Sequence, residues 1–212
     1  MLFRSIGPQG SGKGTQAKLL SEKYKIPHIS TGDIFRQLAA EGDKLGIEAR
    51  EKYLGKGLLV PDEITIELVR KRLAKKDCAK GYILDGFPRT VQQAEALQKI
   101  STIDCAIEIS LTDDEAVYRL SGRRNCPQCQ ANYNISTEPK PKKDELCDKC
   151  GIRLVQRADD REEEIRVRLA KYHKETKPVL SYYEKLWIVR KVDGTKTIEE
   201  VSRDIIRILE GN

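Results

Sequence analysis

Long hydrophobic runs are missing from this chain of 212 residues. No apolar stretch approaches the ~20 residues of a membrane-spanning helix, so we expect no membrane partner. The first seven residues carry Arg4 inside their only apolar stretch, and we therefore expect no export signal. Six cysteines without an export signal indicate a reducing compartment. We predict a cytoplasmic protein whose thiols are metal ligands or buried groups rather than disulfides.

Aromatic residues are also scarce, at 6% of the chain, and one charge sign barely exceeds the other. The 39 Lys and Arg against 33 Asp and Glu leave a net charge of +6. An excess of this size fits an anionic ligand such as a phosphate compound, and it is too small for a protein that wraps nucleic acid. No segment repeats with a period of roughly 20–50 residues, which excludes a solenoid.

Short β-type runs alternate with amphipathic stretches along the chain. Strands are predicted at residues 2–6, 26–29, 82–84, 105–111 and 187–192. Helices are predicted at 13–24 and from Asp62, Thr112 and Thr197, the last two with a glutamate that completes a capping box. This order predicts an α/β fold with a parallel sheet covered on both faces. Residues 30–60 and 122–160 break the alternation, and we interpret them as two insertions.

A glycine-rich segment, Gly7 to Thr15, follows the first predicted strand and opens the first helix. Its glycines let backbone N–H groups surround phosphate oxygens, and the helix N-terminus adds partial positive charge. The spacing fits a P-loop, with Lys13 placed to reach the outer phosphates and Thr15 near a Mg²⁺ ion. Gly14 departs from the pattern, because a hydroxyl residue usually follows the lysine. The predicted triphosphate contacts here are Gly10, Ser11, Gly12, Lys13, Gly14 and Thr15.

Four of the cysteines form two Cys-x2-Cys pairs with 17 residues between them. They are Cys126, Cys129, Cys147 and Cys150. This spacing is typical of a tetrahedral zinc site, and four protein ligands leave no open position, so the Zn²⁺ would be structural. Iron bound by the same sulfurs, free thiols and a redox pair stay open as alternatives. Cys78 and Cys105 are isolated and are predicted to be small buried hydrophobes.

Five segments occur in one order: the P-loop, residues 28–36 (HISTGDIFR), 85–90 (DGFPRT), 122–124 (GRR) and 157–160 (RADD). Together they closely resemble adenylate kinases of the long, bacterial type with a zinc-bearing lid, over about residues 2–209. The resemblance implies a P-loop kinase core with a five-stranded parallel sheet flanked by helices. It assigns residues 1–29, 61–121 and 161–212 to this core, 30–60 to a helical monophosphate-binding insertion, and 122–160 to a zinc-ribbon-like lid.

The activity implied by the resemblance is reversible, Mg²⁺-dependent transfer of a phosphoryl group from ATP to AMP, which gives two ADP. Such a transfer proceeds in line and needs positioning and charge neutralisation rather than covalent work by the protein, and lid closure would complete the site. Arginine suits forked contact with phosphate. Asp85 resembles the family's acidic residue near Mg²⁺, with Asp33 as a second candidate. The implied catalytic residues are Lys13, Asp85, Arg89, Arg123, Arg157 and Arg168.

The resemblance also implies the nucleotide contacts. Those for AMP are Thr31, Arg36, Leu58, Leu59, Val60, Gly86, Phe87, Pro88, Arg89, Gln93, Arg157 and Arg168. Those for ATP, beyond the P-loop, are Arg119, Arg123, Asn132, Tyr133 and Lys196, with Arg119 stacked on the base. The expected partners are ATP, AMP and ADP, with no nucleic acid. We expect a monomer, while a trimer and the strictness of the donor base stay open.

Several of these assignments have simpler structural interpretations. Gln93 stands three residues after Thr90 and could be its capping-box partner. Thr31 or Asp33 could cap the next helix.

The charged residues have such interpretations as well. Arg36 could be a solvated surface charge, and Arg168 could pair with Glu164 one helical turn earlier. Asp159 and Asp160 stand ahead of a helix, where they could both cap it and hold lid arginines.

Two other functions are also open at this point. A kinase for UMP or CMP is the nearest, although Thr31 and Gln93 argue against it. A nucleotide-binding zinc-ribbon protein that binds nucleic acid would use the basic tip at residues 140–143 (KPKK), but no aromatic run accompanies that tip. A scaffold that binds nucleotide without turnover would not need so many arginines.

Overall fold

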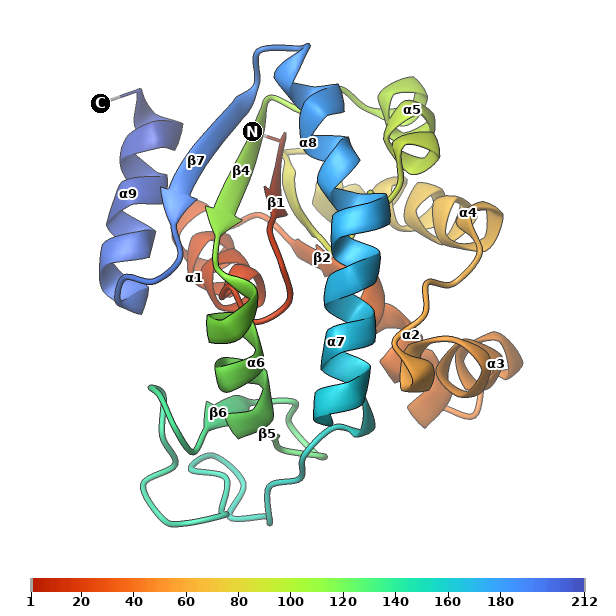
Figure 1. The fold of residues 1–212 in the computed structure, drawn as a ribbon. Coiled ribbons are helices and arrows are strands. Elements are labelled where there is room, and N and C mark those ends of the chain that lie inside the picture. Colours follow the sequence, from red (N-terminus) through yellow and green to blue (C-terminus); the bar gives the residue numbers. More distant parts are fainter. Residues whose placement is uncertain (1, 212) are drawn as a thin grey trace.

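The protein, described here over residues 2–211 of a computed structural model, is built on one central sheet. Its five parallel strands lie in the order β2-β3-β1-β4-β7 (Figure 1). They are β1 (Leu2–Ile6), β2 (His28–Ser30), β3 (Tyr82–Asp85), β4 (Cys105–Ser110) and β7 (Val189–Asp193). Because β1 pairs with both β3 and β4, the loop that follows β1 emerges at the centre of the carboxyl edge. The predicted α/β fold with a five-stranded parallel sheet is confirmed.

Two helices, α1 (Lys13–Tyr24) and α9 (Ile198–Glu210), cover one face of the sheet (Figure 1). Phe3 and Ile83 from the strands pack there against Leu20 and Ile205. The predicted capping box at the start of α9 is present, with the Thr197 and Glu200 side chains bonded reciprocally to backbone N–H groups.

Three helices cover the opposite face: α4 (Asp62–Leu73), α5 (Val91–Ile100) and α8 (Lys177–Glu184). Leu84 of β3 packs against Val69 and Leu97, while Ile6 of β1 packs against Tyr183. A 3₁₀ turn, Lys76–Cys78, precedes β3 and buries Cys78 against the same core. Cys105 is only partly buried, at the start of β4.

The first insertion forms a small helical unit that projects beyond the sheet (Figure 1). It contains α2 (Thr31–Ala40), α3 (Lys44–Lys52) and a 3₁₀ turn at Leu54–Lys56. A Cβ on Gly46 would lie 2.2 Å from the backbone nitrogen of Ala39, so the absence of a side chain allows α2 and α3 to pack closely. Phe35, Ala49 and Val60 form the core of this unit.

The second insertion follows α6 (Asp113–Gly122) and has little regular structure. Its antiparallel pair, β5 (Arg123–Asn125) and β6 (Asn132–Asn134), lies at the bottom of Figure 1. A 3₁₀ turn at Ala158–Asp160 leads back into α7 (Glu162–Lys171), and a π-helical turn at Tyr172–Thr176 joins α7 to α8.

Some predicted boundaries are wrong by one or two residues. The strand expected at 26–29 begins at His28 instead, after Pro27, whose carbonyl accepts from Ile83. The strand expected from Trp187 begins at Val189, because Trp187 has a φ of 61° and is 87% exposed. The strand expected at 105–111 ends at Ser110.

The capping box expected at Thr112 is half present. Thr112 accepts from the N–H of Glu115, but the Glu115 carboxylate pairs with Arg119 instead.

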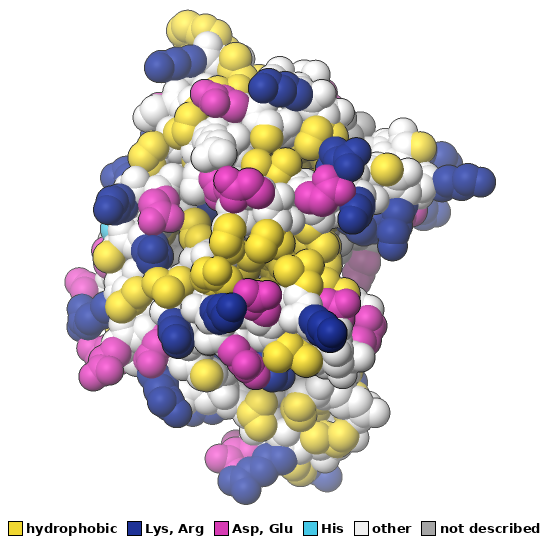
Figure 2. Space-filling view, turned by 90° about the vertical axis from the view of Figure 1, so that its right-hand side faces the viewer, with side chains coloured by type: hydrophobic (Ala, Val, Ile, Leu, Met, Phe, Trp, Pro, Cys, Tyr) yellow, Lys and Arg dark blue, Asp and Glu magenta, His cyan; other side chains and the backbone are white. Residues whose placement is uncertain are grey.

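Charged side chains of both signs are interspersed around hydrophobic ones on the face drawn in Figure 2. The modest net charge is therefore spread as mixed charge on this face rather than as one basic surface. Among the helices of residues 2–211, none is both long enough and apolar enough to cross a bilayer.

Candidate functional site

The glycine-rich loop leaves β1 and feeds directly into α1 at the carboxyl edge of the sheet. The N-cap of α1 is Gly12, with a φ of 87° and no capping side chain, so the first N–H groups of the helix have no side-chain acceptor. Lys13 Nζ donates to the carbonyls of Gly7 and Pro8, at 2.9 and 2.7 Å. An uncapped helix N-terminus beside a buried lysine is suited to an anionic ligand.

Asp85 ends β3 beside this loop. Register pairs it with Ser5, and Nε2 of His28 lies 3.5 Å from its carboxylate. Burial raises the pKa of Asp85, but His28, Lys13 and a nearby arginine outweigh that effect, and the net pKa is lowered. A Cβ on Gly14 would lie 3.4 Å from Asp85 Oδ2, an ordinary van der Waals contact, so Gly14 and the carboxylate are direct neighbours.

A pocket opens between the glycine-rich loop, the end of β3 and the π-helical turn, and we call it the loop pocket. The charged side chains that line it are Arg4, Lys13, Asp85 and Arg89. Burial lowers the pKa of Lys13 to about 8, with Asp85 acting in the opposite direction. Seven of the lining residues were not predicted. Five come from β1 and the start of the glycine-rich loop, and long-range packing brings the other two, Tyr172 and Thr176; the five are Arg4, Ser5, Ile6, Gly7 and Gln9.

A second pocket, which we call the apolar pocket, lies between the helical insertion and β3. Six of the predicted AMP contacts line it: Thr31, Leu59, Val60, Gly86, Arg89 and Gln93. Four further lining residues were not predicted: Gly32, Phe35, Leu54 and Thr65. Phe35 follows Thr31 by four residues in α2, a spacing that could have revealed it. Gly86 and Arg89 line both pockets, so the two pockets adjoin each other at these residues.

Three other predicted AMP contacts do not line the apolar pocket. Leu58 is partly buried outside the lining of the apolar pocket. Phe87 is fully buried in the core beneath β3, and the carbonyl of Pro88 accepts from Arg4.

Gln93 is fixed by two polar contacts at the edge of the apolar pocket. Its Oε1 accepts from the N–H of Arg89 at 2.7 Å, and its Nε2 donates to Asp62 at 2.6 Å. Thr90 caps α5 by accepting from the Gln93 N–H. The side chain of Gln93 bonds to Arg89 and Asp62 rather than to Thr90, so the capping-box interpretation is only half correct.

Neither Thr31 nor Asp33 is the cap of α2. Ser30 caps this helix through the N–H of Asp33, while Thr31 Oγ1 donates to the carbonyl of Gly86 at 3.1 Å. Asp33 forms an ion pair with Arg36 at 2.5 Å, so Arg36 has a partner but remains partly exposed.

Asp160 is completely buried and holds two arginines. Arg123 donates to it at 2.7 and 2.5 Å, and Nη1 of Arg168 lies 3.2 Å from it. Arg168 also donates to the Asp159 carbonyl, and Glu164 is not its partner. Because α7 has no side-chain cap, the expected capping role of the two aspartates is wrong and their arginine-holding role is correct.

Arginines from three parts of the chain influence one another electrostatically. Burial lowers the pKa of Arg157 to about 10, and Arg123 and Arg36 add to that effect. The pKa of Arg89 is lowered by burial and by Arg168. A Cβ on Gly57 would lie 2.8 Å from Arg168 Cγ, so the helical insertion directly contacts α7. Partly buried cations in such number favour an anionic ligand of high charge.

The other predicted ATP contacts lie around this group of arginines rather than within it. Arg119 donates to Glu115 and to the Gly194 carbonyl, and Lys196 pairs with Asp204 on the surface. Asn132 accepts from Arg157 at 3.3 Å. The Tyr133 hydroxyl lies 3.6 Å from Cys147 Sγ, in the core of the second insertion.

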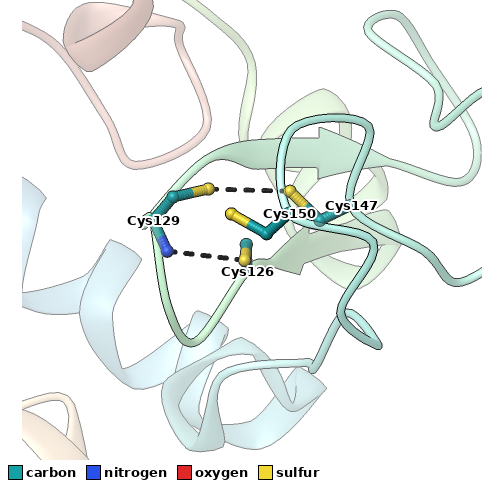
Figure 3. A group of neighbouring side chains, drawn as sticks. All are labelled: Cys126, Cys129, Cys147 and Cys150. Atoms are coloured by element: carbon teal, nitrogen blue, oxygen red, sulfur yellow. Dashed lines mark hydrogen bonds between the residues drawn. The ribbon is translucent and has the colours of Figure 1, made fainter.

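The four cysteine thiols of the second insertion meet at one point (Figure 3). Their sulfurs lie within 4.8 Å of one another, and Cys129 and Cys147 Sγ are 3.6 Å apart. A tetrahedral zinc site with Zn–S bonds of about 2.3 Å places its sulfurs roughly 3.8 Å apart. The two Cys-x2-Cys turns close in the same way. The N–H groups of Gln130 and Gly151 donate to the carbonyls of Cys126 and Cys147. The donor set therefore fits a metal ion such as zinc.

A comparison with known proteins agrees with this geometry. The family model described as "Adenylate kinase" matches residues 5–188. The chain is 49% identical over 212 residues to an adenylate kinase of Clostridium novyi, with 98% of this chain and 97% of the relative covered. It is 50% identical over 210 residues to one of Archaeoglobus fulgidus, with 97% and 96% covered. The chain belongs to the adenylate kinase family. It is accordingly a nucleoside monophosphate kinase, an ATP:AMP phosphotransferase.

In this adenylate kinase, Asp160 supplies the buried counter-charge for Arg123 and Arg168. Asp160→Asn should lower the free energy of unfolding by roughly 3 kcal/mol, because two arginines lose a buried counter-charge. Urea denaturation checks this. Glu162→Gln is the matched control, since its exposed pair with Arg166 should contribute less than about 0.5 kcal/mol. Equal effects of the two substitutions would contradict the assignment.

Proposed function

We propose that this protein transfers a phosphoryl group reversibly from Mg·ATP to AMP by direct in-line displacement, with closure of residues 122–160 over the triphosphate. The observation that carries the proposal is that the two pockets share Arg89 and Gly86. A monophosphate in the apolar pocket and a triphosphate at the glycine-rich loop would therefore meet at one arginine.

The apolar pocket is proposed as the site of AMP. The adenine would lie among Thr31, Leu59, Val60 and Gln93, and the phosphate would point toward Arg89. Arg36 would bind the same phosphate by giving up its ion pair with Asp33, and both side chains of that pair reach solvent. Because the AMP phosphate is already an oxyanion, it attacks without a general base.

The glycine-rich loop is proposed as the site of the ATP phosphates. Backbone N–H groups of residues 10–15 would surround them, and Lys13 would exchange its contacts with Gly7 and Pro8 for phosphate oxygens. Arg119 is proposed beside the adenine of ATP, with Asn132, Tyr133 and Lys196 as lesser contacts.

In the transfer, an oxygen of AMP forms a bond to the terminal phosphorus of ATP, and the bond from that phosphorus to the bridging oxygen breaks. The transferring group carries spread negative charge in this transition state. Arg89, Arg123, Arg157 and Arg168 are proposed to neutralise it as residues 122–160 close. Closure would also exclude water, which otherwise competes with AMP as the acceptor.

Mg²⁺ would be held by the phosphates together with Asp85, through water, and the Thr15 hydroxyl. The lowered pKa of Asp85 keeps it an anion, as such a ligand requires. When bound, the ion would neutralise charge on the outer phosphates.

Phosphorus NMR tests the proposed reaction. ADP should appear when the protein, Mg²⁺, ATP and AMP are combined, and should not appear when either nucleotide is omitted. UMP and CMP in place of AMP should give little product, because the apolar pocket is proposed to hold adenine. Free phosphate from ATP alone would indicate an NTPase and contradict direct transfer, and a preference for a pyrimidine would reassign the acceptor.

The lowered pKa of Lys13 predicts that the affinity for ATP depends on pH. Its pKa of about 8 means that the ammonium form, which the phosphates require, is lost as the pH rises above 8. The affinity should fall by up to about tenfold per pH unit, and binding at pH 8 should take up about half a proton. Calorimetry between about pH 7 and 9.5 measures both.

Lys13→Arg is the control for this measurement, because its guanidinium stays charged throughout that range. The variant should show no such slope, whatever its absolute affinity. A slope that persists in Lys13→Arg would remove Lys13 from the triphosphate site.

Zn²⁺ is proposed as the metal of the four cysteines. Cys147→Ser should lose about one equivalent of bound zinc and lower the melting temperature, because metal binding supplies folding energy to a segment with few apolar residues. Metal analysis and calorimetry check this. Cys105→Ser, outside the cluster, should keep its zinc. Full zinc content in Cys147→Ser, or purified protein without metal, would contradict the assignment.

A further inference from the structure

The central strand β1 carries a charge in the interior of the protein. Arg4 is 1% exposed, between Phe3 and Ile6, which belong to two apolar clusters. Its guanidinium carbon lies 5.7 Å from the centre of the Tyr183 ring. Burial lowers the pKa of Arg4 to about 10, so the side chain remains a cation at neutral pH.

The guanidinium of Arg4 is only partly satisfied by the protein. Its Nη2 donates to the carbonyl of Pro88, while Nε and Nη1 have no acceptor among residues 2–211. Arg4 also lines the loop pocket, together with Lys13 and Arg89. Removing a charge from water costs several kcal/mol unless the ion is paired, and an apolar side chain of similar volume is often at least as stabilising. Stability therefore does not account for an arginine in this strand.

The peptide group between Pro88 and Arg89 is held at both ends. Arg4 donates to its carbonyl, and Gln93 accepts from its N–H at 2.7 Å. The Arg89 side chain is fixed in turn, since its Nε donates to the Gly86 carbonyl at 2.8 Å. The one arginine that both pockets share is thus oriented by two buried side chains, and one of them, Arg4, brings a positive charge to the same place.

We propose that Arg4 is a positioning residue for the phosphate acceptor: through the Pro88 carbonyl it fixes Arg89, the arginine that lines both pockets. This inference rests on the proposed function, because the proposed function places the phosphate of AMP at Arg89. A preorganised arginine loses little conformational freedom when substrate binds, so the effect falls on AMP affinity.

Arg4→Met tests the proposal, since it keeps the unbranched stem of the side chain as far as the position of Nε and removes the charge and the donors. The KM for AMP should rise roughly tenfold, with the KM for ATP at neutral pH within about twofold of the parent. The melting temperature should be unchanged or higher, because an unpaired buried charge is removed. Arg4→Lys keeps a charge and one donor and should recover part of the AMP affinity.

A control variant and a second readout distinguish a positioning role of Arg4 from a structural one. Arg70→Met removes an exposed arginine paired with Glu67 and should leave both KM values unchanged. The pH profile supplies a readout that a structural role would not move: Arg4 helps to lower the pKa of Lys13, so in Arg4→Met the loss of ATP affinity should begin at higher pH.

Three results would overturn the proposal. These are an unchanged KM for AMP in Arg4→Met, equal increases in the KM for both nucleotides, and a failure of Arg4→Met to fold while Arg4→Lys keeps the AMP affinity of the parent, which would make Arg4 structural. The proposed function fails separately, if the unsubstituted protein gives no ADP from ATP and AMP.

Discussion

Repulsion among partly buried cations is the constraint on which the rest of this structure depends. Arg89, Arg157, Arg168 and Lys13 are all partly buried. Burial lowers the pKa of each, and nearby arginines lower it further. Few carboxylates oppose them: Asp85 at the glycine-rich loop and the pair Asp159 and Asp160 at the start of α7. The folded protein therefore holds positive charge that only a polyanionic ligand can balance, and the apolar clusters must stabilise it in that state.

The parallel sheet makes this accumulation possible. The carboxyl ends of β1 and β3 are adjacent, so the glycine-rich loop and Asp85 meet without any special folding of the chain. The arginines then arrive from separate segments: Arg36 from the helical insertion, Arg89 after β3, and Arg168 from α7. The proposed closure would bring these charges together by moving the insertions, while the sheet stays fixed.

The sequence predicted the parts of this arrangement that depend on local patterns. The alternation of strands and helices, the glycine-rich loop, and the cysteine spacing each follow from residues close together in the chain. The contacts of Arg168 were harder to predict, because Glu164 at helical spacing was as plausible as Asp160, and only tertiary packing decides between them. Phe35 and Leu54 were missed because a pocket wall depends on how the insertion folds back. Arg4 was noted only as a charge that interrupts an apolar run, since nothing near it in sequence indicates a buried partner at Pro88.

The two insertions solve the same problem of stability in different ways. The helical insertion packs Phe35, Ala49 and Val60 into a small apolar core, which the close contact at Gly46 makes possible. The second insertion has Tyr133 and Leu154 as its buried hydrophobes, and the other buried members of its cluster are Cys126 and Cys147. Two apolar side chains do not offset the entropy of ordering about 40 residues, so we expect a metal bound by the sulfurs to stabilise this cluster. The metal proposed for the cysteines would make residues 122–160 rigid. A rigid segment would carry Arg123 and Arg157 over a bound triphosphate with fixed geometry, as the proposed function requires.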